Sequence, residues 1–315
     1  MSALGYARRG LENLIGNWQL ILIAAAESLL IFLFVIFPIG VWGYRKWQVA
    51  EDAEAFAESV LRIYLDVFEN PVILIGIFVL VLVIGTIALV IHSMVMAGIV
   101  RIYLAGEREM GDRARIDYDP RPSTFDLGVW WAGAKSNWFD IFLIYNLVWG
   151  ISGLLILLPL LPLLFLAFTA NDEQRLLITL TAGGCAWALL TLVIVFLSRA
   201  WANLAIARSV MDDLGVMAAA RSSIDIITRQ PVTTLTLIFL MVLISLGAGA
   251  GGSVVSYSTE AIPAVVAISG LLALVSGLIN VFISAAAALW MVASFVAMAF
   301  DLSTHEPVDH GKAFA

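Results

Sequence analysis

Long apolar runs alternate with short polar stretches along most of the chain. Six runs reach the length of about 20 residues that a helix needs to cross a bilayer. They cover residues 18–43, 72–100, 139–170, 176–207, 232–252 and 264–300. This pattern predicts an all-α integral membrane protein with six transmembrane helices. Pro159 and Pro162 fall within the third run and predict a kink or break there, because proline removes a helical hydrogen bond.

A shorter pattern repeats three times at the polar ends of these runs. An amphipathic stretch opens at a Leu-Gly pair and leads into an apolar run, over residues 4–16, 127–136 and 214–228. Two apolar runs follow each stretch, which predicts three repeated helical hairpins, each preceded by a short cytoplasmic amphipathic helix. We therefore expect a single membrane domain over residues 1–315, with repeats at 1–110, 126–213 and 214–303 and a cytoplasmic tail at 304–315.

Composition supports a membrane protein and argues against several other classes. Apolar residues make up 62% of the chain and charged residues only 13%, against about 25% charged residues in soluble domains. The net charge of −7 argues against nucleic-acid binding. The single cysteine, Cys185, excludes a disulfide framework and a cysteine metal cluster. No P-loop, serine hydrolase or zinc protease motif occurs, so no catalytic, cofactor-binding or metal-binding residues are predicted.

Basic residues gather on one side of the predicted spans. Of the 17 Lys and Arg residues, only Arg45, Lys46, Arg62 and Arg175 fall on the side opposite the N-terminus. Cytoplasmic segments carry the excess of Lys and Arg in membrane proteins. We therefore expect a multi-pass protein of the cell inner membrane, with both termini in the cytoplasm.

The connector after the fourth run has a recognisable pattern. Asp212-Asp213-Leu214-Gly215 precedes a short helix of the type Ala-x-x-x-Ser that enters the next run. This segment resembles the cytoplasmic connector of the membrane domain attached to some glycerophosphodiester phosphodiesterases and of the YciC-like family. The similarity is strongest over residues 199–245, weaker over 92–165 and faint at the N-terminus. The resemblance implies a helical membrane domain; no segment of this chain has the length and polarity of the phosphodiesterase barrel, so that activity is not implied.

Three ionisable side chains lie inside predicted spans, namely Glu27, His92 and Arg199. Each lies nine or ten residues from the polar inner end of its span, so a helical rise of 1.5 Å per residue places all three at one depth, about 14 Å from that end. Ionisable groups inside a membrane are costly and mark paired or functional sites. We expect Glu27 to pair with His92 or Arg199, with Asn203 among the neighbouring partners. The cluster either holds the hairpins together or forms a polar pocket or proton-linked pathway.

The segment between the first two spans has the periodicity of an amphipathic helix. Apolar residues recur at steps of four and three on one face, at Val49, Ala53, Phe56, Val60, Ile63 and Val67. One interpretation is a helix lying across the outer ends of the bundle. The alternative is a surface for docking a partner protein through Phe56, Val60, Ile63 and Val67.

A glycine-rich run occupies residues 245–253. Small residues stand four apart in it, with Ser245 before Gly249 and Gly247 before Gly251, a spacing that lets membrane helices pack closely. The run follows an apolar helix rather than a strand, so we expect helix packing and not a phosphate-binding loop.

Two functions remain open at this stage. The leading interpretation is a non-enzymatic scaffold or accessory subunit of a membrane complex, because no catalytic constellation occurs and the outer helix offers a docking face. The alternative is a transporter or lipid-handling protein that uses the polar level of Glu27, His92 and Arg199. The expected partners are membrane lipids and one or more proteins in the membrane or on its outer face.

The predicted orientation is testable by cysteine labelling from the two sides of the membrane. Single cysteines at Glu54 and at His310, introduced after Cys185 is replaced by serine, should react with an impermeant reagent from opposite sides. Labelling of both positions from the same side would contradict the predicted topology.

Overall fold

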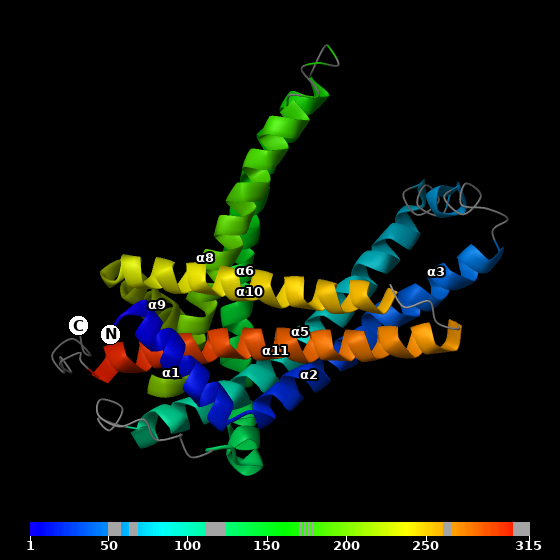
Figure 1. Cartoon of the computed structure of the whole chain (residues 1–315). Helices are drawn as coiled ribbons and strands as arrows, with labels where there is room; N and C mark the ends of the chain where they lie inside the picture. Colours follow the sequence, from blue (N-terminus) through cyan, green and yellow to red (C-terminus); the bar gives the residue numbers. More distant parts are fainter. Residues whose placement is uncertain are drawn as a thin grey trace.

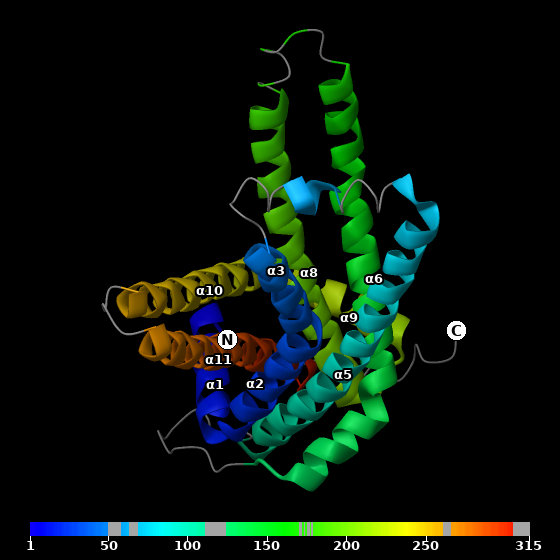
Figure 2. The same ribbon diagram turned by 90° about the vertical axis from the view of Figure 1, so that its right-hand side faces the viewer.

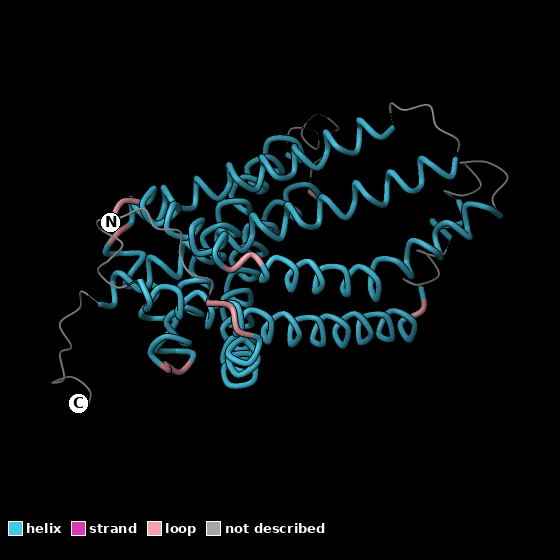
Figure 3. The backbone as a smooth tube through the Cα atoms, turned by 60° about the horizontal axis from the view of Figure 1, so that its bottom comes forward, coloured by secondary structure: helices cyan, strands magenta, loops and turns pink. Residues whose placement is uncertain are grey.

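The computed structural model describes residues 1–49, 58–62, 69–110, 124–169, 172, 174, 177, 179–260 and 266–304. These residues are helical almost throughout, and no strand occurs among them (Figure 3). Within this described part, four helices are long and apolar enough to cross a membrane, or up to six spans if each of two bent helix pairs counts as one. The all-α class is thereby confirmed for the described residues, and several of their helices are long and apolar enough to cross a membrane.

The described helices follow one another along the chain. In chain order they are α1 (Ala3–Gly16), α2 (Gln19–Ile31), the π-helical turn η1 (Phe32–Ile36), α3 (Phe37–Val49), α5 (Pro71–Met110), α6 (Leu127–Phe168), the π-helical turn η3 (Thr179–Gly183), α8 (Gly184–Asp212), α9 (Val216–Arg229), α10 (Pro231–Glu260) and α11 (Val266–Thr304). Pro38 explains the first π-helical turn, because it has no N–H to donate to the carbonyl four residues earlier. The helix widens by one residue there instead of ending.

The long helices form three pairs that diverge from a common base. The pairs are α2 and α3 with α5, α6 with α8, and α10 with α11. In Figure 1 the α6–α8 pair points upward while α10 and α11 run to the right, and the view in Figure 2 also shows the pairs separating. The helices α1 and α9 lie against the base (Figure 1). The three pairs therefore share one packed region and separate beyond it.

The hydrophobic core lies in this base. Its fully buried large side chains include Tyr6 of α1, Tyr103 of α5, Ile144 of α6, Ile206 of α8 and Phe295 of α11. Beyond the base, the paired helices expose bulky apolar side chains, such as Ile75, Phe78, Leu82, Leu154, Leu158, Phe165, Leu189 and Val193. Exposed apolar helices of this length are expected where the surrounding solvent is lipid.

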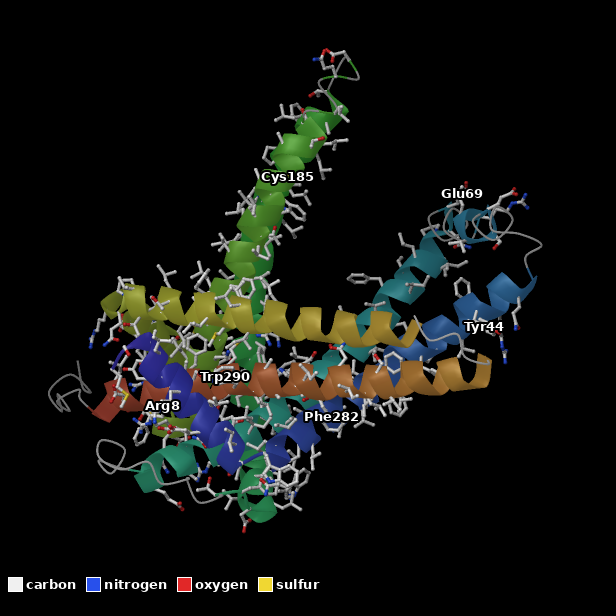
Figure 4. All side chains as sticks on the ribbon, in the orientation of Figure 1. Arg8, Tyr44, Glu69, Cys185, Phe282 and Trp290 are labelled. Atoms are coloured by element: carbon white, nitrogen blue, oxygen red, sulfur yellow. The ribbon has the colours of Figure 1, made fainter. Side chains whose placement is uncertain are left out.

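The first helix is held against the last one by polar contacts near the start of the chain. The Tyr6 hydroxyl donates to Asp301 Oδ2 at 2.7 Å, and burial together with this carboxylate raises the pKa of the Tyr6 hydroxyl. The Trp290 indole N–H donates to the Ala7 carbonyl at 2.7 Å, where α1 crosses α11 (Figure 4). A Cβ at Gly10 would lie against Ser294. The start of α1 and the end of α11 therefore lie together on one side of the molecule.

Two of the three expected amphipathic segments are separate helices, and the third is not. The axis turns by 85° between α1 and α2 and by 99° between α9 and α10. At the first bend, the Asn17 amide donates to the Asn13 carbonyl at 3.1 Å, which satisfies an end of α1. At the second, Pro231 begins α10, and proline disfavours a helical residue before it.

Residues 127–136, by contrast, continue without a break into the long helix α6. The sequence there lacks a proline, and the Ser136 hydroxyl donates a hydrogen bond to Asn137 Oδ1 at 2.6 Å within the continuous helix. The same helix also runs unbroken through Pro159 and Pro162. Of the kink or break expected at these prolines, the break is absent from α6, and the kink stays a prediction.

The close packing expected of the glycine-rich run is wrong for its described residues. A Cβ added at Gly247 or Gly249 meets nothing within 4 Å. Close approaches occur in the base instead, where a Cβ at Gly98 would clash with Trp130 and one at Gly106 with Asn13. Small residues thus bring helices together in the base rather than along α10.

A buried ion pair joins α1 to α5, and sequence reasoning missed it. Arg9 pairs with Glu107, whose side chain is 0% exposed. Asn13 donates to Glu107 Oε1 at 3.0 Å and to the Tyr103 carbonyl at 3.1 Å. Both carboxylate oxygens of Glu107 are therefore engaged by α1.

Removing Glu107 should destabilise the protein strongly. Glu107→Ala leaves the buried Arg9 guanidinium without its carboxylate, which typically costs about 3–5 kcal/mol of unfolding free energy. Glu12→Ala is the matched control, because its ion pair with Arg8 is exposed and such pairs contribute less than about 1 kcal/mol. Unfolding in detergent micelles titrated with dodecyl sulfate measures both, and equal losses for the two variants would refute the structural role of the buried pair.

Candidate functional site

A cavity of about 620 Å³ lies where the three helix pairs diverge. Residues from α2, α5, α6, α8, α10 and α11 line it, so it is formed by all three pairs. Its polar lining residues are Glu27, Ser28, His92, Tyr145, Arg199, Asn203, Ser245 and Ser284. Three alanines of α11, at positions 285, 287 and 288, leave room on the facing side. The four residues of the expected intramembrane cluster all lie on this one cavity.

Glu27 and His92 are in direct contact. The Nδ1 atom of His92, on α5, lies 2.7 Å from Oε1 of Glu27, on α2. The Glu27 side chain is only 8% exposed. An ionised carboxylate only accepts hydrogen bonds, so Nδ1 is the donor in this contact when Glu27 is ionised. Of the two partners expected for Glu27, the structure thus brings His92 to it.

The chain of hydrogen bonds continues to a tyrosine of the second helix pair. Nε2 of His92 lies 3.2 Å from the Tyr145 hydroxyl, and the two ring centroids are 5.2 Å apart. In a neutral imidazole with its hydrogen on Nδ1, Nε2 accepts, so the Tyr145 hydroxyl donates to it. Glu27, His92 and Tyr145 therefore connect α2, α5 and α6 at the cavity.

Tyr145 was not among the expected site residues. The available signal was a phenol within an apolar run, since a buried tyrosine hydroxyl usually finds a hydrogen-bond partner. A tyrosine within an apolar run does not by itself indicate which residue forms the hydrogen bond with its hydroxyl. The partner depends on how α5 crosses α6, which the spacing along the sequence does not determine.

Arg199 and Asn203 line the same cavity from α8. They stand one helical turn apart, on one face of the helix. The Arg199 side chain is exposed, and no carboxylate in the described part of the chain forms an ion pair with it. Asn203 is 6% exposed, and its Nδ2 atom has no hydrogen-bond partner among the described residues. The helix α8 thus contributes a guanidinium group and a buried side-chain amide to the residues that line the cavity.

The cavity is lined by one acidic and one basic side chain, Glu27 and Arg199, with the His92 imidazole beside them. The surrounding lining is apolar, so water screens these charges less than it does at a protein surface. The arrangement can therefore bind a polar or anionic group beside apolar material.

The candidate docking helix lies mostly outside the described residues. Phe56, Ile63 and Val67 are not described, whereas Val60 belongs to a short helical stretch at residues 58–62 and is exposed. Within that stretch Arg62 donates to Glu58 Oε1 at 2.8 Å. The docking face therefore stays a prediction.

Comparisons of the chain with known proteins identify no relative that could indicate the role of this cavity. No family model matches the chain, and neither a curated protein nor a solved structure matches it significantly. The resemblance of residues 199–245 to a cytoplasmic connector accordingly stays a hypothesis.

Removing the Glu27 carboxylate should cost stability, and an amide should recover part of the loss. Glu27→Ala leaves the His92 Nδ1–H without its acceptor, which typically costs about 1–3 kcal/mol of unfolding free energy. Glu27→Gln retains an acceptor oxygen, so we expect a smaller loss. Thermal unfolding in mild detergent measures both, with Glu58→Ala as the control for an exposed carboxylate. A Glu27→Ala protein as stable as the wild type contradicts the pairing.

Proposed function

We propose that this protein is a lipid-handling membrane protein that binds an amphiphile in the cavity between its three helix pairs. The observation that carries this proposal is the mixed lining of the cavity. Glu27, His92, Tyr145, Arg199 and Asn203 form a polar side, and α11 contributes small and apolar side chains. A molecule with a polar head and an apolar tail satisfies both sides.

The size and position of the cavity favour an amphiphile over a small ion. Ligand pockets for small molecules typically occupy about 300–1,000 Å³, and this cavity falls within that range at about 620 Å³. The helix pairs separate beyond it (Figures 1 and 2), and their exposed apolar side chains suit contact with acyl chains. A head group held at the polar side therefore leaves space for its tail along the diverging helices.

The finer architecture belongs to the same proposal. We propose an inner-membrane protein of three related hairpins, with amphipathic helices on the cytoplasmic side and both termini in the cytoplasm. The similar bends at α1–α2 and α9–α10 and the contact between the start of α1 and Asp301 support this arrangement. The continuous α6 departs from it in the second hairpin. The membership in the phosphodiesterase membrane-domain group or the YciC-like family is part of this hypothesis.

The scaffold or accessory-subunit interpretation stays a prediction. Its motivation was a docking face on the outer side, of which the described residues include only Val60. The cavity provides a specific observation for lipid handling, and we therefore give lipid handling precedence. Protein partners on the outer face remain compatible with it.

Filling the cavity should remove bound lipid without unfolding the protein. Ala288 lines the cavity, whereas its neighbour Ala286 is not among the lining residues. We expect the wild type and Ala286→Phe to retain lipid through purification in dodecyl maltoside, and Ala288→Phe to lose it. Native mass spectrometry measures the bound lipid, and melting temperatures identify variants that fail to fold. Equal lipid retention by Ala288→Phe and the wild type counts against the proposed function.

A further inference from the structure

We infer that the cavity binds an anionic head group and takes up a proton at His92 when it does so. This inference rests on the proposed function and specifies its ligand class. Two features carry it, namely the donors on α8 and the hydrogen-bond chain from Glu27 through His92 to Tyr145.

The donors on α8 select for a negatively charged acceptor. Arg199 has a guanidinium with five N–H groups in a planar fork, which matches the oxygens of phosphate and carboxylate groups. Asn203 adds a buried Nδ2 that lacks a hydrogen-bond partner among the described residues, an arrangement that is costly unless a ligand supplies the acceptor. An anionic phosphate diester offers acceptor oxygens to both side chains.

Protonation of His92 changes which donors face the cavity. While the imidazole is neutral, its Nε2 accepts the Tyr145 hydroxyl hydrogen, so that hydrogen is not available to a ligand. A protonated imidazole donates from both nitrogens. It keeps its bond to Glu27 through Nδ1, donates to the Tyr145 oxygen through Nε2, and leaves the hydroxyl hydrogen free to turn toward the cavity. One proton therefore adds one positive charge and one donor.

The charges around His92 determine the sign of the pH dependence. The titratable or charged groups that face it are Glu27 from α2, Tyr145 from α6 and Arg199 from α8, whereas α10 and α11 contribute only uncharged residues to the described lining. Gaining a proton changes the lining from neutral to positive, so an anion binds more tightly as the pH falls. By linkage, binding of the anion promotes protonation of His92 to the same extent.

The test compares two lysolipids with the same myristoyl chain. Lysophosphatidylglycerol is anionic and lysophosphatidylcholine is zwitterionic, and neither phosphodiester changes its charge near neutral pH. Binding to the full chain in dodecyl maltoside is measured at about pH 5.5 and about pH 8, on either side of the range in which histidine gains its proton. We expect the affinity for the anionic lipid to rise about tenfold at the lower pH, which corresponds to about 1.4 kcal/mol, while that for the zwitterionic lipid changes little.

Variants assign the effect to His92. The chain has three histidines, so the double variant His305→Asn/His310→Asn leaves His92 as the only one and should keep the full pH dependence. His92→Asn retains an N–H donor for Glu27 and should abolish it. If His92→Asn does not fold, calorimetry of the wild type in two buffers of different ionisation heat provides the answer, because proton uptake makes the apparent binding heat depend on the buffer.

The outcomes separate this inference from the proposed function. Equal binding of both lysolipids at both pH values, or a binding heat independent of the buffer, overturns the inference and leaves lipid binding intact. A pH dependence that persists in His92→Asn also overturns it. Binding of neither lysolipid, or binding unaffected by Ala288→Phe, overturns the inference and the proposed function together.

Discussion

Helices surrounded by lipid gain little from burying apolar side chains against one another, because lipid tails are equally apolar, so they associate where small residues permit close packing. In this protein that condition holds in the base. Ala97, Ala205, Ala207, Ala293 and Ala297 are fully buried there, and Gly98 allows the Trp130 ring to lie directly on the backbone of α5. The positions of all other elements depend on this region, since α1, α5, α6, α8 and α11 meet in it (Figure 1).

The cavity follows from where this packing ends. Beyond the base the helices expose bulky apolar side chains, such as Phe78 of α5 and Leu158 of α6, and the three pairs separate (Figure 1). At the point of separation the alanines of α11 at positions 285, 287 and 288 fill little of the space between the pairs. Polar side chains at this level come from different pairs. Their proximity is thus a consequence of the same packing that holds the base together.

The sequence predicts well the level at which a residue lies along its helix. It predicts poorly which residues of other helices that residue contacts. The constant helical rise placed Glu27, His92 and Arg199 at one level, and these three line one cavity together with Asn203, one helical turn from Arg199. Tyr145 and the Arg9–Glu107 pair were missed, because contacts between helices depend on their rotation and crossing, which span lengths do not encode. The glycines of α10 show the opposite error. Their four-residue spacing permits close packing but does not identify the neighbouring helix, and a Cβ added at Gly247 or Gly249 meets nothing within 4 Å.

Two contacts between ionisable side chains, Arg9 with Glu107 and Glu27 with His92, differ in what surrounds them. Arg9 and Glu107 lie in the base, where α1 and α5 cover them and Asn13 engages the same carboxylate. This group is buried and contributes to holding α1 in place. Glu27 and His92 form a similarly short contact, but they border an open cavity with Arg199 and Asn203 beside them. The same kind of interaction therefore stabilises the fold in one place and is available for binding in the other.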